Sequence, residues 1–112
     1  MSKEVEEGLI YSKTGFRLYR YIHSDGLELE GVYKPLEHKG WGGNFEKYVI
    51  TVGYDNSIKI KRVRDNWNGS GMDVVAHCKA NKSEAKKIKQ KILSAKDQQD
   101  FDELLNYLLD NC

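Results

Sequence analysis

The histidine and cysteine side chains have the greatest potential for chemistry in this chain, and they are few and widely spaced. They are His23, His38, His77, Cys78 and Cys112. Structural zinc sites use pairs of such ligands a few residues apart, a spacing that this sequence lacks. His77 and Cys78 are adjacent, so on a strand their side chains would point to opposite faces. The spacing therefore predicts no metal site.

Catalytic motifs are also missing from the sequence. It contains no P-loop, no dinucleotide-binding fingerprint, no nucleophile elbow and no His-Glu-x-x-His. An enzyme would need a pocket that joins His38, Trp41 and Trp67 with an acidic group. We therefore expect a protein with no catalytic residue and no cofactor.

The number of cysteines is informative about the cellular compartment. Secreted domains of this size usually carry a denser disulfide framework than Cys78 and Cys112 would provide. The first residues are acidic and contain no apolar segment, so they do not predict a signal peptide. No apolar run reaches the length of a membrane-spanning helix. We expect two free thiols, a cytoplasmic location and no membrane partner.

A second kind of chemistry, the binding of a polyanion, is suggested by basic residues in two segments. Lys59 and Lys61 share the outer face of an expected strand, with Arg62 and Arg64 close by. An expected helix adds Lys86, Lys87 and Lys89. Aromatic side chains that could stack on bases are Tyr19, Tyr21 and Trp67. Lysines also complement helix C-termini and protect exposed strands, so nucleic-acid binding is the alternative function rather than the main one.

An aromatic and acidic surface is expected on the first pair of strands. Its members alternate on the outer face: Tyr19, Tyr21, His23, Glu28 and Glu30. Trp41 and Trp67 lie in glycine-rich loops, where they could anchor a partner or cover the end of the sheet. Tyrosine enrichment is typical of protein interfaces. The main expectation is a small non-catalytic interaction protein, a binder or inhibitor of another protein of the kind that phages or toxin–immunity systems encode, or one that binds a second copy.

The elements that position these residues begin with a hairpin. Strand signals start at residues 9–11 and strengthen at Phe16, and Asp25-Gly26 is a strong two-residue turn signal. Pairing across that turn places Ile22 opposite Leu29 and His23 opposite Glu28. The inner face of the hairpin would then be Phe16, Leu18, Ile22, Leu27, Leu29 and Tyr33.

A second hairpin is expected around Asp55-Asn56-Ser57, with Asn56 in the left-handed region. This turn places Tyr54 opposite Ile58 and Val52 opposite Ile60. The inner face would be Ile50, Val52, Tyr54, Ile58 and Ile60. Arg62 falls in phase with that face, which indicates either a place at the rim of the sheet or a bulge. The apolar run 72–78 predicts a further strand, with a helix start as the alternative.

Two helices are expected at the end of the chain. Asn81 and Glu84 form a start signal similar to a capping box. The first apolar stripe is Ala85, Ile88, Ile92 and Ala95, and the second is Phe101, Leu104, Leu105 and Leu108. The two stripes are out of phase, which predicts a break near Lys96 and a second N-cap at Asp97.

These elements predict one α+β domain over residues 1–112. Residues 1–8 would be a flexible lead-in, 9–78 a β-rich part and 81–111 the two helices. The sheet would have four to five antiparallel strands built from two hairpins, with both helices packed on one face. Leu105 and its stripe should then contact Ile50, Val52, Ile58 and Ile60.

Overall fold

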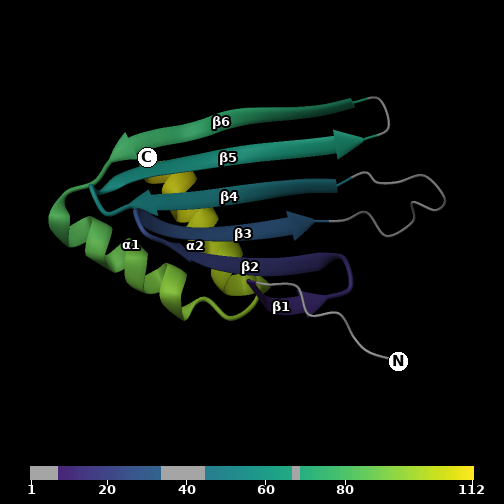
Figure 1. The fold of residues 1–112 in the computed structure, drawn as a ribbon, viewed down its shortest axis with the longest axis horizontal. Coiled ribbons are helices and arrows are strands. Elements are labelled where there is room, and N and C mark those ends of the chain that lie inside the picture. Colours follow the sequence, from purple (N-terminus) through teal and green to yellow (C-terminus); the bar gives the residue numbers. More distant parts are fainter. Residues whose placement is uncertain (1–7, 34–44, 67–68) are drawn as a thin grey trace.

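An antiparallel sheet followed by two helices makes up the fold of the computed structural model, which describes residues 8–33, 45–66 and 69–112 (Figure 1). The strands are β1 (Leu9–Lys13), β2 (Phe16–His23), β3 (Gly26–Tyr33), β4 (Phe45–Gly53), β5 (Ser57–Asn66) and β6 (Gly69–Lys79). The helices are α1 (Lys82–Ser94) and α2 (Gln98–Asn111). The six strands lie in chain order, each antiparallel to the next. The predicted α+β class is confirmed, but the sheet has six strands rather than four or five.

The additional strand arises from an unpredicted turn at Gly15. Gly15 has a φ of 85°, in the left-handed region that glycine tolerates. It allows the chain to reverse between Lys13 and Phe16, which are paired across β1 and β2. A single strand signal over residues 9–23 is therefore two strands.

The first predicted hairpin has the right faces but the wrong register. His23 pairs with Gly26, so the turn is Ser24-Asp25 and Ile22 lies opposite Leu27 rather than Leu29. A shift of two residues keeps every side chain on its predicted face, because the side-chain period of a strand is 2. The shift places Ile22 beside the turn, where it is 68% exposed instead of part of the core.

The surroundings of Gly26 explain why the turn is not Asp25-Gly26, as was predicted. A Cβ at Gly26 would lie 2.5 Å from the carbonyl oxygen of Val52 on β4. The glycine is therefore required for close approach of two strands, and Gly26 belongs to β3 rather than to the turn.

The second hairpin shows the same kind of shift. Val52 pairs with Ile58, so the turn is formed by residues 54–56, and Asn56 has the predicted left-handed conformation with a φ of 70°. Tyr54 was predicted on the inner face, but it lies in the turn and is 53% exposed. Arg62 follows a regular β4–β5 register, and the bulge lies instead in β6, at the register shift opposite Ile60 and Lys61.

The core fills the space between one face of the sheet and the helices (Figure 1). Its strand members are Phe16, Leu18, Leu27, Leu29, Ile50, Val52, Ile58 and Ile60. Both predicted helix stripes contribute to the same cluster, including Ile88, Ile92, Phe101, Leu104, Leu105 and Leu108. The helices therefore cover one face, and the opposite face of the sheet carries neither of them.

Both helix starts agree with the predictions. Asn81 Oδ1 accepts a hydrogen bond from the Glu84 amide at 2.8 Å, and Asp97 Oδ1 accepts one from the Asp100 amide at 3.0 Å. The end of α1 has a partner from the sheet. The Arg20 guanidinium donates to the carbonyl oxygen of Ala95 at 3.1 Å, which places a positive charge at the negative end of the helix.

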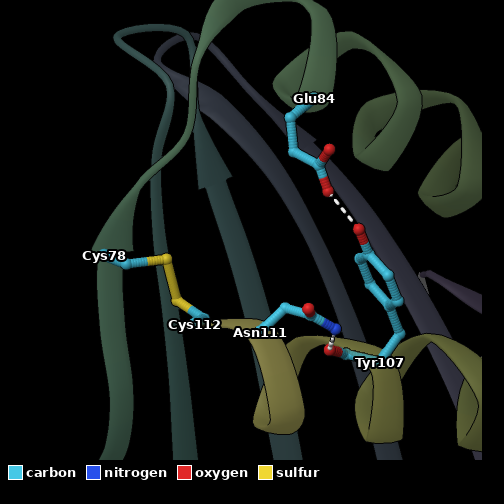
Figure 2. Close-up of a disulfide and its surroundings, with 5 residues drawn as sticks. All are labelled: Cys78, Glu84, Tyr107, Asn111 and Cys112. Carbon is cyan, nitrogen blue, oxygen red and sulfur yellow. Dashed lines mark hydrogen bonds between the residues drawn. A yellow bond between two sulfur atoms is a disulfide. The ribbon is translucent and has the colours of Figure 1, made fainter.

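A disulfide between Cys78 and Cys112 corrects the expectation of two free thiols (Figure 2). The bond becomes possible because α2 runs back along the sheet and ends beside β6, with the two Cα atoms 5.5 Å apart. Nearby, the Tyr107 hydroxyl of α2 donates a hydrogen bond to Glu84 of α1 (Figure 2). The expected cytoplasmic location rested in part on free thiols, and it stays a prediction.

Candidate protein-binding face

The face of the sheet opposite the helices, called the open face below, is built from alternate residues of β2 to β6. Strand register sets two rows across it. The first row is Tyr21, Glu28, Thr51, Lys59 and His77, and the second is Tyr19, Glu30, Val49, Lys61 and Val74. The structure thus brings together all of the described residues of the predicted aromatic and acidic surface, together with Lys59 and Lys61.

The aromatic part of the open face is a ladder of stacked rings along β2. The Tyr19 and Tyr21 ring centroids are 6.2 Å apart, with an interplanar angle of 5°. Tyr21 and His23 are also 6.2 Å apart, at 25°. Tyr19 is only 8% exposed, whereas Tyr21 is half-buried and His23 is exposed. The more exposed end of this ladder is therefore Tyr21 and His23, although Gly8 lies against the Tyr21 ring.

The acidic side chains of β3 are already paired within the chain. His23 Nε2 lies 2.9 Å from Glu28 Oε1, and Lys47 Nζ lies 2.9 Å from Glu30 Oε2. His23 and Glu28 are diagonal neighbours rather than the directly opposed pair that was predicted, because Tyr21 is the residue opposite Glu28. Both contacts hold the carboxylates in place, and the Lys47 ammonium also offsets the charge of Glu30.

The basic side chains of β5 differ in this respect. Lys59 and Lys61 are half-exposed, and no ion pair to either is found in the described part of the chain. A shallow hollow of about 520 Å³ at the turn end of the sheet is lined by both lysines and also by Asp25 and Asp55. The positive charge of the open face is therefore concentrated on β5.

The other predicted nucleic-acid residues lie elsewhere. Arg62 and Arg64 are in phase with the helix side of the sheet, where Arg62 lies 3.5 Å from Glu46 and Arg64 lies 3.7 Å from Asp73. Lys86, Lys87 and Lys89 belong to α1, which packs on the helix-covered face. Lys89 lies over the Tyr54 ring, 5.3 Å from its centroid. The sheet thus separates the strand lysines from the helix lysines.

An apolar group on β6 has no counterpart among the predicted site residues. Residues 71–75 are all exposed, and Met72, Val74 and Val75 are 62%, 54% and 40% exposed. The apolar run 72–78 correctly predicted a strand. Its place at the edge of the sheet depends on strand order, which the sequence does not reveal.

The structure does not describe every residue that was singled out from the sequence. Trp41, Trp67 and His38 lie outside the described residues. Within the ranges that are described, no group of three or more His, Cys, Asp or Glu side chains could hold a metal ion. None of the described helices is long and apolar enough to span a membrane.

Comparison with known proteins gives no family. Neither protein-family models, nor curated proteins, nor solved structures match this chain. Function must therefore be argued from the geometry of the open face.

Proposed function

We propose that this chain is a non-catalytic binding protein that recognises another protein through the open face of its sheet. The observation that carries the proposal is the ordered ladder of Tyr21 and His23 beside the paired carboxylate of Glu28. Aromatic side chains with fixed positions bury contact area at a low entropic cost, which is why tyrosine is favoured at protein interfaces. The helices leave this ladder accessible because they cover only the other face.

The charges of the open face suggest the chemistry of the partner. Glu30 is paired with Lys47 and Glu28 is in contact with His23, whereas neither Lys59 nor Lys61 is in an ion pair within the described residues. A partner surface with carboxylates over β5 would supply the missing pairs, and charge complementarity of this kind increases association rate and specificity. We therefore expect an acidic partner surface with apolar or aromatic contacts over β2.

Affinity capture with paired variants tests this proposal. The tagged protein would be compared with a Tyr21→Ala/His23→Ala variant and a Lys59→Glu/Lys61→Glu variant, each checked for folding by circular dichroism. The matched control is Tyr107→Ala/Lys86→Ala, which changes exposed residues on the helix side. Loss of a captured protein from both open-face variants, with retention by the control, is the expected result. Equal capture by all of the variants would reject the open face as the binding surface.

Nucleic-acid binding is the second candidate function, and fewer basic residues support it than the sequence suggested. Only Lys59 and Lys61 of the predicted basic set lie on the open face, and Arg62 and Arg64 already have acidic neighbours. Because phosphate contacts are strongest at low salt, labelled RNA and DNA would be titrated across a salt series. Absence of binding at the lowest salt would eliminate this candidate and leave protein recognition.

A further inference from the structure

The two edges of the sheet differ in how well they are protected. At one edge, β1 has 5 residues and a register shift between Leu9 and Tyr11. At the other, β6 has 11 residues, more than any other strand of the described chain. Edge strands present unpaired N–H and C=O groups, and natural proteins limit them by short length, bulges, charge or proline. β1 follows this pattern, whereas β6 is a long edge (Figure 1).

The first half of β6 has the properties of a strand that can accept a further strand. From Gly69 to Val74 it follows a continuous register with β5, and its bulge comes only after Val74. This half contains no proline and one charged residue, Asp73, which already lies 3.7 Å from Arg64. Met72 and Val74 are both more than half exposed, so strand addition here would remove apolar surface from water.

We infer that β6 pairs with β6 of a second copy of this chain, antiparallel about a two-fold axis at Met72, to join two sheets into one. In this register Met72 lies opposite its counterpart, Val74 opposite Ser70, and Asp73 opposite Gly71. A Cβ placed on Gly71 would meet nothing within 4 Å, so the position facing Asp73 is uncrowded. Main-chain hydrogen bonds give such an interface its affinity, and the two-fold makes it self-complementary.

Charge disfavours two competing arrangements of the same strand. Moving the axis by one residue, to Asp73, would place two carboxylates directly opposite each other, which destabilises a strand pair. A parallel copy in register would do the same. The axis at Met72 avoids this repulsion and keeps all of the paired residues within the regular half of the strand. The strand's own sequence is therefore a suitable partner for it.

This inference is independent of the proposed function. The β6 edge lies at the opposite end of the sheet from the Tyr21–His23 ladder, with β3, β4 and β5 between them. A dimer through β6 would leave both ladders accessible, and a monomer could still use its ladder. Failure of one idea therefore does not decide the other.

Sedimentation equilibrium of the full chain tests the dimer. The wild-type protein should show a concentration-dependent monomer–dimer equilibrium. Met72→Glu and Met72→Lys, each alone, should abolish the dimer, because the two-fold would bring like charges together. An equimolar mixture of the two variants should restore it, because opposite charges would then meet across the axis. Restoration on mixing is a result that simple misfolding of either variant could not produce.

The control is Ile22→Glu, which places the same charge on an equally exposed apolar residue of β2. This variant should dimerise as the wild type does. A wild-type chain that stays monomeric at every concentration would overturn the inference. A dimer that survives Met72→Glu, or a mixture that stays monomeric, would overturn the β6 pairing about Met72.

Discussion

Cys78 on β6 is bonded to Cys112, the residue that caps the C-terminal end of α2, across a sequence separation of 34 residues (Figure 2). The bond joins the last helix to the edge strand of the sheet, so one covalent link closes a loop that contains both helices. A cross-link of this kind restricts the unfolded chain, and the effect grows with the length of the loop. In the folded state, the same link fixes α2 against β6.

The first prediction concerns this bond. Cys112→Ser should lower the free energy of unfolding by about 3–4 kcal/mol, the chain-entropy value for a loop of this length. Urea denaturation with and without reductant measures the change. Reductant should destabilise the wild type by a similar amount and leave Cys78→Ser/Cys112→Ser unaffected. A wild-type midpoint that reductant does not change would show that the bond contributes no stability.

A second prediction follows from the contact between Gly31 and Phe101. A Cβ at Gly31 would collide with the ring of Phe101, which is fully buried. Gly31→Ala should therefore destabilise the fold by about 1–3 kcal/mol through overpacking. Thermal denaturation measures the coupling free energy between the two positions when Gly31→Ala and Phe101→Leu are compared with the double variant. The double variant should lose less stability than the two single changes added together, because the smaller side chain makes room for the methyl group. Strict additivity would contradict the proposed contact.

The predictions that succeeded from sequence relied on local periodicity. The α2 stripe through Leu105 and the cap at Asp97 are set by residues three or four positions apart, and both were found where predicted. The faces of β2 to β5 were also correct within the strands, because alternation alone assigns them, although Tyr54 lies in a turn beyond the end of β4. Strand register was harder to predict from the sequence, because Gly26 has two possible roles. It can be a turn residue or a residue that allows close approach of a neighbouring strand, and only the position of Val52 distinguishes these roles.

The open face could be predicted in part for the same reason. Alternation placed Tyr21 and Glu28 on one face, but their burial and ion pairs depend on strand order. The edge position of β6 depends on strand order, and the disulfide depends on where α2 ends relative to the sheet. No local pattern records either relation. The open face and the β6 edge, on which the two proposals rest, therefore depend on long-range contacts rather than on local sequence patterns.

The third prediction tests the place of α2 in the core. Leu105 is 6% exposed and belongs to the cluster that includes Ile50 and Ile60. Leu105→Ala should lower the free energy of unfolding by about 2–5 kcal/mol, because it removes buried methyl groups and leaves a cavity. Leu109→Ala, at a 40% exposed position of the same helix, is the matched control and should cost much less. A near-wild-type melting curve for Leu105→Ala would remove α2 from the core.

The fourth prediction concerns the hydrogen bond that joins β2 to the end of α1. Arg20→Met keeps most of the aliphatic stem and removes the donor to Ala95. It should destabilise the fold by about 1.5–3 kcal/mol, the range for hydrogen bonds to charged groups. Arg64→Met removes a charge from an exposed pair and should change stability by less than about 1 kcal/mol. Equal effects of the two substitutions in urea denaturation would show that Arg20 has no special role at the helix end.

The last prediction is a pH dependence at Tyr33, whose hydroxyl donates a hydrogen bond to Asp102 Oδ1 at 2.6 Å. Burial raises the pKa of Tyr33 above its ordinary value of 10.0, and the hydrogen bond and negative charge of Asp102 raise it further. The folded state thus binds the proton more tightly than the unfolded state. Stability from this group is fully present below pH 10.0 and is lost as the pH rises above that value, because the unfolded chain then releases the proton first.

The free energy of unfolding of the wild type should accordingly fall more steeply above pH 10.0 than that of Tyr33→Phe, which has no proton to lose at this position. Urea denaturation at a series of alkaline pH values measures the difference. Tyr54→Phe is the control, since Tyr54 lies exposed in the β4–β5 turn, and its curve should follow the wild type. Parallel curves for the wild type and Tyr33→Phe would show that the two states bind the Tyr33 proton equally. The link between β3 and α2 through Asp102 would then have no part in the alkaline stability of the fold.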